Sequence, residues 1–241
     1  MEEYDYVFFN IFDDVYIQDV FVTYNEHIYD NAVLKPFDFS QKTALFVGDS
    51  ITKGYVNGSD IDEENAWPTL FASHFNLASF ENRAVGGATI ATVEGQGKIL
   101  YQIAGANQFD YLFIAGGVND CNKNVSVETF KSAVNELINS VLNYMDANQN
   151  MKTIWITPID NALGYDSKDE FPNLQKYRNI ITEEVTRRNN GRMSIIQGNK
   201  LPFPKVGDSY EYITTMYGDL LHPSAIGYKN CYLPGLINAL I

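Results

Sequence analysis

Basic residues, histidines and cysteines are all scarce in this sequence of 241 residues. Lysine and arginine number 17 against 30 aspartates and glutamates, so the net charge is −13. A protein that binds nucleic acid needs a basic face, and no part of the sequence offers a cluster of basic residues. The same shortage weighs against anionic membranes and polyphosphate substrates. We therefore expect no nucleic acid among the partners of this chain.

The small numbers of cysteines and histidines limit the candidates for disulfides, metal ligands and a catalytic base. Cys121 and Cys231 are too few for a disulfide scaffold and lack the spacing of metal ligands. We interpret them as two ordinary thiols, with a bridge between them as the alternative. The histidines are His27, His74 and His222, so a search for a histidine base has only three candidates.

Long apolar runs are also missing. No stretch approaches the roughly 18 apolar residues that cross a bilayer, so we expect no membrane span. The first residues lack the basic region of a secretory signal. The location stays open, with extracellular, cell-surface and phage-particle-associated proteins as the alternatives considered.

The first 40 residues differ from the rest in charge and in pattern. They hold nine of the 30 acidic residues and one of the 17 basic residues. Alternating aromatic residues at 4–8 and a β-branched and aromatic run at 15–24 predict two strands. Two strands do not form a stable domain alone. We interpret residues 1–40 as a β-rich segment for oligomerisation or attachment to a larger assembly, or as a simple hairpin on the main domain.

The pattern of residues 41–241 alternates strands with helices. Apolar runs predict strands at 43–47, 78–82, 111–115, 152–157 and 193–197. Helical spacing predicts helices at 67–75, 127–145, 174–188 and 225–239. Ser126 is placed to cap the second helix, and Pro234 is expected to kink or restart the last one. This order predicts an α/β domain with a five-stranded parallel sheet covered by helices on both faces.

Polar and glycine-rich segments follow the predicted strands. Ser50 follows the first strand, and glycine-rich residues 82–89 follow the second. Residues 116–120 follow the third strand, and residues 219–223 follow the fifth. Because ligands of such sheets bind beyond the carboxyl ends of the strands, we expect these four loops to border one cleft.

The residue types in these loops suit ester hydrolysis. A serine hydroxyl needs a base to accept its proton, and His222 is the candidate base for Ser50. Asp219, three residues earlier, can hold the imidazole through its Nδ1–H. The backbone N–H groups of Ser50 and Gly87 and the side-chain amide of Asn119 can donate to the oxyanion of the tetrahedral intermediate.

Taken in order, the four segments resemble the conserved blocks of the SGNH hydrolase superfamily, also called GDSL esterases and lipases. The blocks read Gly-Asp-Ser-Ile at 48–51, a glycine block ending at 87, Gly-Val-Asn-Asp at 117–120 and Asp-Leu-Leu-His-Pro at 219–223. The resemblance implies a flavodoxin-like three-layer fold and a mechanism without metal or cofactor. It also implies Ser50, His222 and Asp219 as the catalytic triad, with Ser50, Gly87 and Asn119 as the oxyanion hole.

Other polar and aromatic residues have structural interpretations. Asp49 and Asp120 flank the predicted site and are expected to hold loops through backbone hydrogen bonds. His74 shares a helix face with apolar residues and is interpreted as packed or exposed there. The following aromatic residues could line a sugar-binding cleft, although Trp67 could equally belong to the core: Tyr55, Trp67, Tyr165 and Tyr217.

The residues leave the substrate open. We expect a carboxylester hydrolase for small acyl esters, most plausibly O-acetyl groups on a polysaccharide, because no long apolar lid suggests a lipase and aromatic residues make up 14%. A lysophospholipase or thioesterase of the same superfamily is the alternative among enzymes. An inactive carbohydrate-binding or structural module is the alternative of another class.

Overall fold

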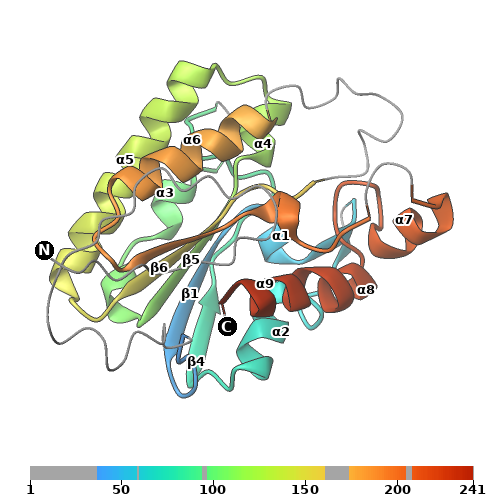
Figure 1. Ribbon diagram of the computed structural model, residues 1–241, viewed down its shortest axis with the longest axis horizontal. Coiled ribbons are helices and arrows are strands. Elements are labelled where there is room, and N and C mark those ends of the chain that lie inside the picture. The colour runs from blue at the N-terminus through green and yellow to red at the C-terminus, as the bar shows by residue number, and fades with distance from the viewer. Residues whose placement is uncertain (1–36, 59, 94–96, 161–173, 205–207, 241) are drawn as a thin grey trace, which may run out of the picture. The chain divides into compact units, whose positions relative to one another are not determined.

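The computed structural model describes residues 37–58, 60–93, 97–160, 174–204 and 208–240 (Figure 1). The two strands predicted at 4–8 and 15–24, His27 and Tyr165 lie outside these residues. The interpretation of residues 1–40 as a β-rich segment therefore stays a prediction.

A parallel sheet of five strands forms the centre of the domain. Its strands are β1 (Thr43–Gly48), β4 (Ser79–Asn82), β5 (Tyr111–Ala115), β6 (Lys152–Ile156) and β7 (Met193–Ile196). They lie in the order β4-β1-β5-β6-β7. All five predicted strands and the α/β class are confirmed. From β1 the next strand of the sheet, β4, lies on one side, while from β5 the next strand, β6, lies on the other side. The strand order therefore reverses between β1 and β5. Folds of this type bind ligands at such a point.

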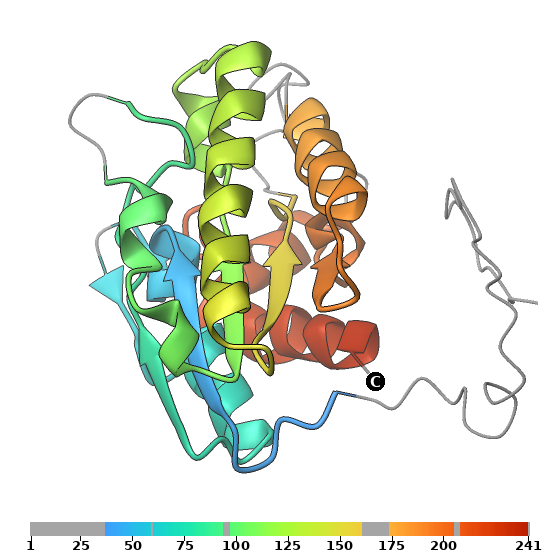
Figure 2. The ribbon, with the colours of Figure 1, turned by 90° about the vertical axis from the view of Figure 1, so that its left-hand side faces the viewer.

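Helices cover both faces of the sheet (Figures 1 and 2). One face carries α3 (Ile99–Gln102), α5 (Val127–Ala147) and α6 (Leu174–Arg187). The other carries α2 (Trp67–His74) and α9 (Leu233–Leu240). Side chains alternate along each strand, so Leu112 and Ile114 of β5 are buried under the first layer while Tyr111 and Phe113 are buried under the second. The predicted three-layer arrangement is thus confirmed.

Aromatic rings fill the core on the α2 face. The Phe46 ring stacks on Phe113 with centroids 4.7 Å apart, and the Phe39 ring lies 4.6 Å from Tyr111. Trp67 is fully buried and stacks on a tyrosine of the C-terminal helical segment, so it belongs to the core and lines no sugar cleft. Phe39 is also buried, which means that the core extends to residues before the predicted boundary at 40.

The predicted C-terminal helix is interrupted. Residues 225–239 form α8 (Ala225–Gly227), a π-helical turn η4 (Tyr228–Tyr232) and then α9. Pro234 is the second residue of α9, where its missing N–H removes no hydrogen bond of that helix. The restart expected at Pro234 is therefore confirmed, and Ser126 caps α5 as predicted by accepting from the N–H of Thr129.

Short elements connect the layers, and the sequence patterns did not predict them. They are α1 (Ser50–Lys53), β2 (Tyr55–Asn57), β3 (Asp60–Ile61), η1 (Ala106–Gln108), α4 (Val118–Asn122), η3 (Gly198–Lys200) and α7 (Tyr210–Met216). Cys121 and Cys231 are both buried, in cores on opposite faces of the sheet, so the alternative of a bridge between them is wrong. Within the described ranges, no helix combines the length and the apolar character that spanning a membrane demands.

A buried glutamine on α3 closes the end of β1. The side chain of Gln102 accepts a hydrogen bond from the Gly48 N–H at 2.8 Å and donates one to the Gly48 carbonyl at 2.9 Å. Replacing it with leucine would leave a buried N–H group without its partner, and such a loss costs about 1–3 kcal/mol.

We therefore expect Gln102→Leu to lower the free energy of unfolding by about 1–3 kcal/mol in urea titrations. Gln149→Leu is the matched control, because the Gln149 side chain donates only to an exposed carbonyl. Equal stability of the two variants would contradict the assigned role of Gln102.

Candidate active site

A tight turn after β1 places Ser50 at the carboxyl edge of the sheet. β1 ends at Gly48, and Asp49 caps α1 by accepting a hydrogen bond from the N–H of Ile51 at 3.0 Å. A β-carbon at Gly48 would lie 2.4 Å from the carbonyl oxygen of Ala115, so only glycine fits there. As the first residue of α1, Ser50 has a backbone N–H without an acceptor inside its own helix. That N–H is free to face a substrate.

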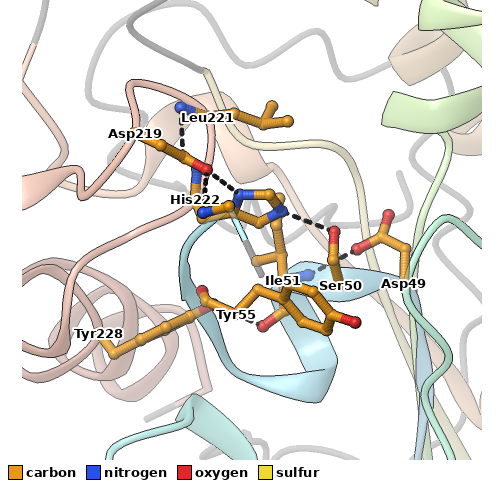
Figure 3. Close-up of polar contacts among 9 residues, drawn as sticks. Asp49, Ser50, Ile51, Tyr55, Asp219, Leu221, His222 and Tyr228 are labelled. Carbon is orange, nitrogen blue, oxygen red and sulfur yellow. Dashed lines mark hydrogen bonds and ion pairs between the residues drawn. The ribbon is translucent and has the colours of Figure 1, made fainter. Parts of the chain in front are cut away.

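Three side chains form one continuous chain of hydrogen bonds (Figure 3). The Oγ of Ser50 lies 2.8 Å from Nε2 of His222, and Nδ1 of His222 lies 2.7 Å from Oδ2 of Asp219. Ser50 and His222 are 172 residues apart in the sequence and both are buried. The structure therefore brings together the three residues predicted as a catalytic triad, with the geometry of proton transfer from serine to histidine.

The Asp219 carboxylate is anchored from two parts of the chain. Its Oδ1 accepts from the backbone N–H of Leu221 at 3.1 Å and of His222 at 2.7 Å, while Oδ2 also accepts from the N–H of Gly58 at 2.7 Å. Burial acts to raise the pKa of Asp219, but the hydrogen bonds from His222 and Gly58 outweigh it, and the pKa is lowered. Asp219 is thus held as a carboxylate that fixes the imidazole.

The loop between Asp219 and His222 has an unusual backbone. Leu220 has a φ of 66°, in the left-handed region that residues other than glycine rarely adopt. Strain of this kind persists only where the surroundings fix the backbone, and here the Asp219 carboxylate binds both following N–H groups. Sequence reasoning identified this loop but missed Gly58, because nothing in the Gly58 segment signals a contact with residue 219.

The predicted oxyanion donors lie in two neighbouring loops. The N–H of Ala88 bonds to the Val85 carbonyl at 3.0 Å, which closes a turn whose third residue, Gly87, has a φ of 76°. A positive φ at this position favours glycine. The side-chain amide of Asn119 donates to the Ala88 carbonyl at 3.0 Å and so links the loops after β4 and β5. One amide hydrogen of Asn119 is thereby fixed, and the second is left for another acceptor.

Two buried aspartates support the loops around Ser50, as predicted. Asp120 accepts hydrogen bonds from the backbone N–H groups of Ile90 at 2.9 Å and Ala91 at 2.8 Å. Burial raises the pKa of Asp120 to about 6. Burial also raises the pKa of Asp49 to about 7, and the charge of Asp120 adds to this effect. Both carboxyl groups therefore titrate within reach of neutral pH.

The remaining candidate residues have other surroundings. His74 is exposed on α2 beside the ring of Phe75. Tyr217 is buried and donates to the Asp160 carbonyl, so it supports a loop and does not line an open cleft. Tyr55 is half-buried, and its ring centroid lies 5.7 Å from that of His222. Tyr55 is thus the aromatic residue of the predicted cleft that the structure places beside the triad.

Comparison with known proteins agrees with this geometry. A family model described as GDSL-like lipase/acylhydrolase matches residues 46–229. The chain belongs to this family. The matched range contains Ser50, Asp219 and His222, together with both loops of the predicted oxyanion donors. This GDSL protein is therefore a member of an esterase family, and the resemblance seen in its four sequence blocks is confirmed. No similar sequence was found among curated proteins.

Solved structures share the fold at low sequence identity. A lipase/acylhydrolase from Enterococcus faecalis is 18% identical with a TM-score of 0.56, covering 82% of this chain and 93% of that chain. A family two carbohydrate esterase from Clostridium thermocellum, solved in complex with cellohexaose, is 17% identical with a TM-score of 0.60. It covers 83% of this chain and 63% of its own. A family two carbohydrate esterase from Cellvibrio japonicus is 16% identical with a TM-score of 0.58, covering 84% and 62%.

The raised pKa of Asp49 gives the stability a defined pH dependence. From the ordinary value of 3.8 to about pH 7, the unfolded chain releases a proton that the folded protein keeps. The free energy of unfolding therefore falls as the pH rises through this window, by up to about 1.4 kcal/mol per pH unit. Asn at position 49 can accept the same hydrogen bond from Ile51 without titrating.

We expect Asp49→Asn to flatten this decline, so that the variant gains stability relative to the wild type between pH 4 and pH 7. Urea unfolding at four pH values across this range measures the difference. Asp146→Asn, at an exposed position on α5, controls for the change in net charge. Parallel curves for the wild type and Asp49→Asn would contradict the effect of burial on this group.

Proposed function

We propose that this GDSL protein is a serine carboxylester hydrolase with Ser50 as nucleophile, His222 as general base and Asp219 as the residue that orients the imidazole. The observation that carries the proposal is the unbroken hydrogen-bond chain from Ser50 Oγ through His222 to Asp219. A lipase/acylhydrolase family model that spans all three residues supports it. The same observation argues against an inactive binding module, which has no need of an aligned base.

The arrangement can carry out acyl transfer in two steps. Ser50 Oγ attacks the ester carbonyl carbon while its proton moves to Nε2 of His222, and the imidazolium that forms is stabilised by Asp219. The oxyanion accepts hydrogen bonds from the N–H groups of Ser50 and Gly87 and from the amide of Asn119. Collapse of the intermediate expels the alcohol, which takes the proton from His222. Water, activated by the same base, then releases the acid and restores Ser50.

We further propose an O-acetyl group on a carbohydrate as the substrate. The fold likeness to two carbohydrate esterases and the half-buried Tyr55 beside His222 support this choice. The acidic chain, with a net charge of −13, disfavours the polyanionic thioesters of coenzyme A. A lysophospholipase or thioesterase activity is the second candidate, because the family description and the Enterococcus faecalis neighbour both name acylhydrolases.

Removal of the nucleophile tests the reaction class. We expect Ser50→Ala to lower kcat for p-nitrophenyl acetate by roughly 10⁴–10⁶-fold, because no other hydroxyl is aligned with His222 among the described residues. Ser132→Ala, at an exposed position on α5, should retain the wild-type rate. Equal rates for the wild type and Ser50→Ala would sink the enzyme proposal.

The amide of Asn119 provides a second test. If it donates to the oxyanion, Asn119→Ala should lower kcat by about 10²–10³-fold while KM changes little. Asn143→Ala, at an exposed position on α5, is the matched control. A near-normal kcat in Asn119→Ala would remove this residue from the oxyanion hole.

The acyl group and its carrier need a separate experiment. Rates for p-nitrophenyl esters from acetyl to octanoyl should fall as the chain lengthens, and acetate should be released from acetylated glycans. A rate that rises toward octanoyl, without acetate release from glycans, would favour the lysophospholipase or thioesterase alternative.

A further inference from the structure

The ring of Tyr55 lies directly beside the triad histidine. Gly54 ends α1 with a φ of 100°, and this left-handed residue turns the chain directly from the Ser50 helix into β2. The Tyr55 ring is tilted by 32° to the ring of His222 (Figure 3). The ring therefore forms the wall of the site beside the base.

The backbone of Tyr55 is held from two sides. The hydroxyl oxygen of Tyr228 lies 2.9 Å from the Tyr55 carbonyl oxygen and 2.8 Å from that of Ile51, so its one proton is shared between these two acceptors. The next strand, β3, pairs with Tyr55 through Ile61. A β-carbon at Gly86 would lie 2.8 Å from the Tyr55 hydroxyl oxygen. Glycine at this position thus leaves room for the hydroxyl beside the turn that carries Gly87.

The hydroxyl of Tyr55 has no hydrogen-bond partner among the described residues, although its side chain is half-buried. The hydroxyls of the buried Tyr217, Tyr228 and Tyr111 all donate to backbone carbonyls. A phenol hydroxyl usually finds a partner when its ring is buried. The Tyr55 hydroxyl is therefore a polar group that is available to a ligand in the site.

The side from which the alcohol leaves decides which part of the substrate lies next to the Tyr55 hydroxyl. The leaving alcohol takes its proton from Nε2 of His222, so its oxygen departs on the His222 side of the tetrahedral carbon. The Tyr55 ring lies along this same imidazole. An alcohol that leaves on this side has the Tyr55 ring as a neighbour, which places the phenol hydroxyl close to any further hydroxyl groups that the alcohol carries.

We propose that Tyr55 determines specificity for the alcohol part of the ester, its hydroxyl forming a hydrogen bond to a second hydroxyl of a polyhydroxylated alcohol such as a sugar. This inference rests on the proposed esterase function and extends it. An alcohol without further hydroxyl groups gains nothing from the phenol. The two kinds of ester can therefore separate the effect of Tyr55 from that of the triad.

The experiment compares two acetate esters that differ only in the alcohol. With the wild type and Tyr55→Phe, kcat/KM is measured for 6-O-acetylglucose and for ethyl acetate. We expect Tyr55→Phe to lower the value for 6-O-acetylglucose by roughly three- to tenfold and to leave the value for ethyl acetate within about twofold. The melting temperature should not change, because the variant loses no hydrogen bond of the described chain.

Tyr144→Phe is the matched control. Tyr144 is also half-buried, and it lies near the end of α5, which reaches the amino-terminal edge of the sheet through Asn148. Its replacement should leave both esters unaffected.

The other outcomes are distinguishable. Four results would each overturn this inference while the esterase function stands. They are equal losses on both esters, no loss on either, a lower melting temperature for Tyr55→Phe, and activity of the wild type on ethyl acetate alone. A wild type that hydrolyses neither ester would overturn the proposed function itself, and the inference with it.

Discussion

The hydrogen bonds of the Asp219 carboxylate are the interaction on which the site depends. Four donors converge on its two oxygens, three from the backbone and one from the imidazole of His222. They close the loop of residues 219–222, hold Leu220 in a strained conformation and bring the β2–β3 hairpin against that loop. An imidazole held in this way keeps its Nε2 directed at Ser50 without further adjustment. Alignment of the base therefore follows from the folding of one short loop.

Two other buried carboxyl groups hold the backbone around Ser50, and their pKa values are raised where that of Asp219 is lowered. Asp49 and Asp120 accept hydrogen bonds from backbone N–H groups but contact no cation among the described residues, and their pKa values are raised to about 7 and about 6. Burying such groups disfavours their charged form. The hydrogen bond of Asp49 fixes the start of α1, which carries Ser50, and those of Asp120 fix the segment that follows the Gly87 turn. The pKa of Asp219, by contrast, is lowered, because hydrogen bonds from the backbone N–H and the imidazole of His222 and from the N–H of Gly58 outweigh the effect of burial.

Much of this arrangement could be predicted from the sequence. The buried strands are apolar runs bounded by turn residues, and every predicted strand lies within one residue of the observed bounds at each end. Residues at the carboxyl ends of parallel strands share one edge, so Ser50, Asn119 and His222 could be placed together. The β2–β3 hairpin and the helix of residues 210–216 were missed, because such short elements carry too little periodic signal. The contact of Gly58 with Asp219 is set by tertiary structure across 161 residues.

The β2–β3 hairpin contacts both Asp219 and His222, although it lies outside the four sequence blocks. Gly58 donates to Asp219, and Tyr55 forms the wall beside His222. The hairpin also lies close against the start of the loop that carries Asp219 and His222, since a β-carbon at Gly218 would come within 1.6 Å of the Val56 carbonyl oxygen. A change in its backbone would therefore alter the orientation of His222 together with the surface that we propose to meet the alcohol. Substitutions of the Tyr55 side chain alone avoid this coupling, because the strand and its contact with Asp219 are made by backbone atoms. The specificity that we propose for Tyr55 can thus vary while the hydrogen bonds of Ser50, His222 and Asp219 are retained.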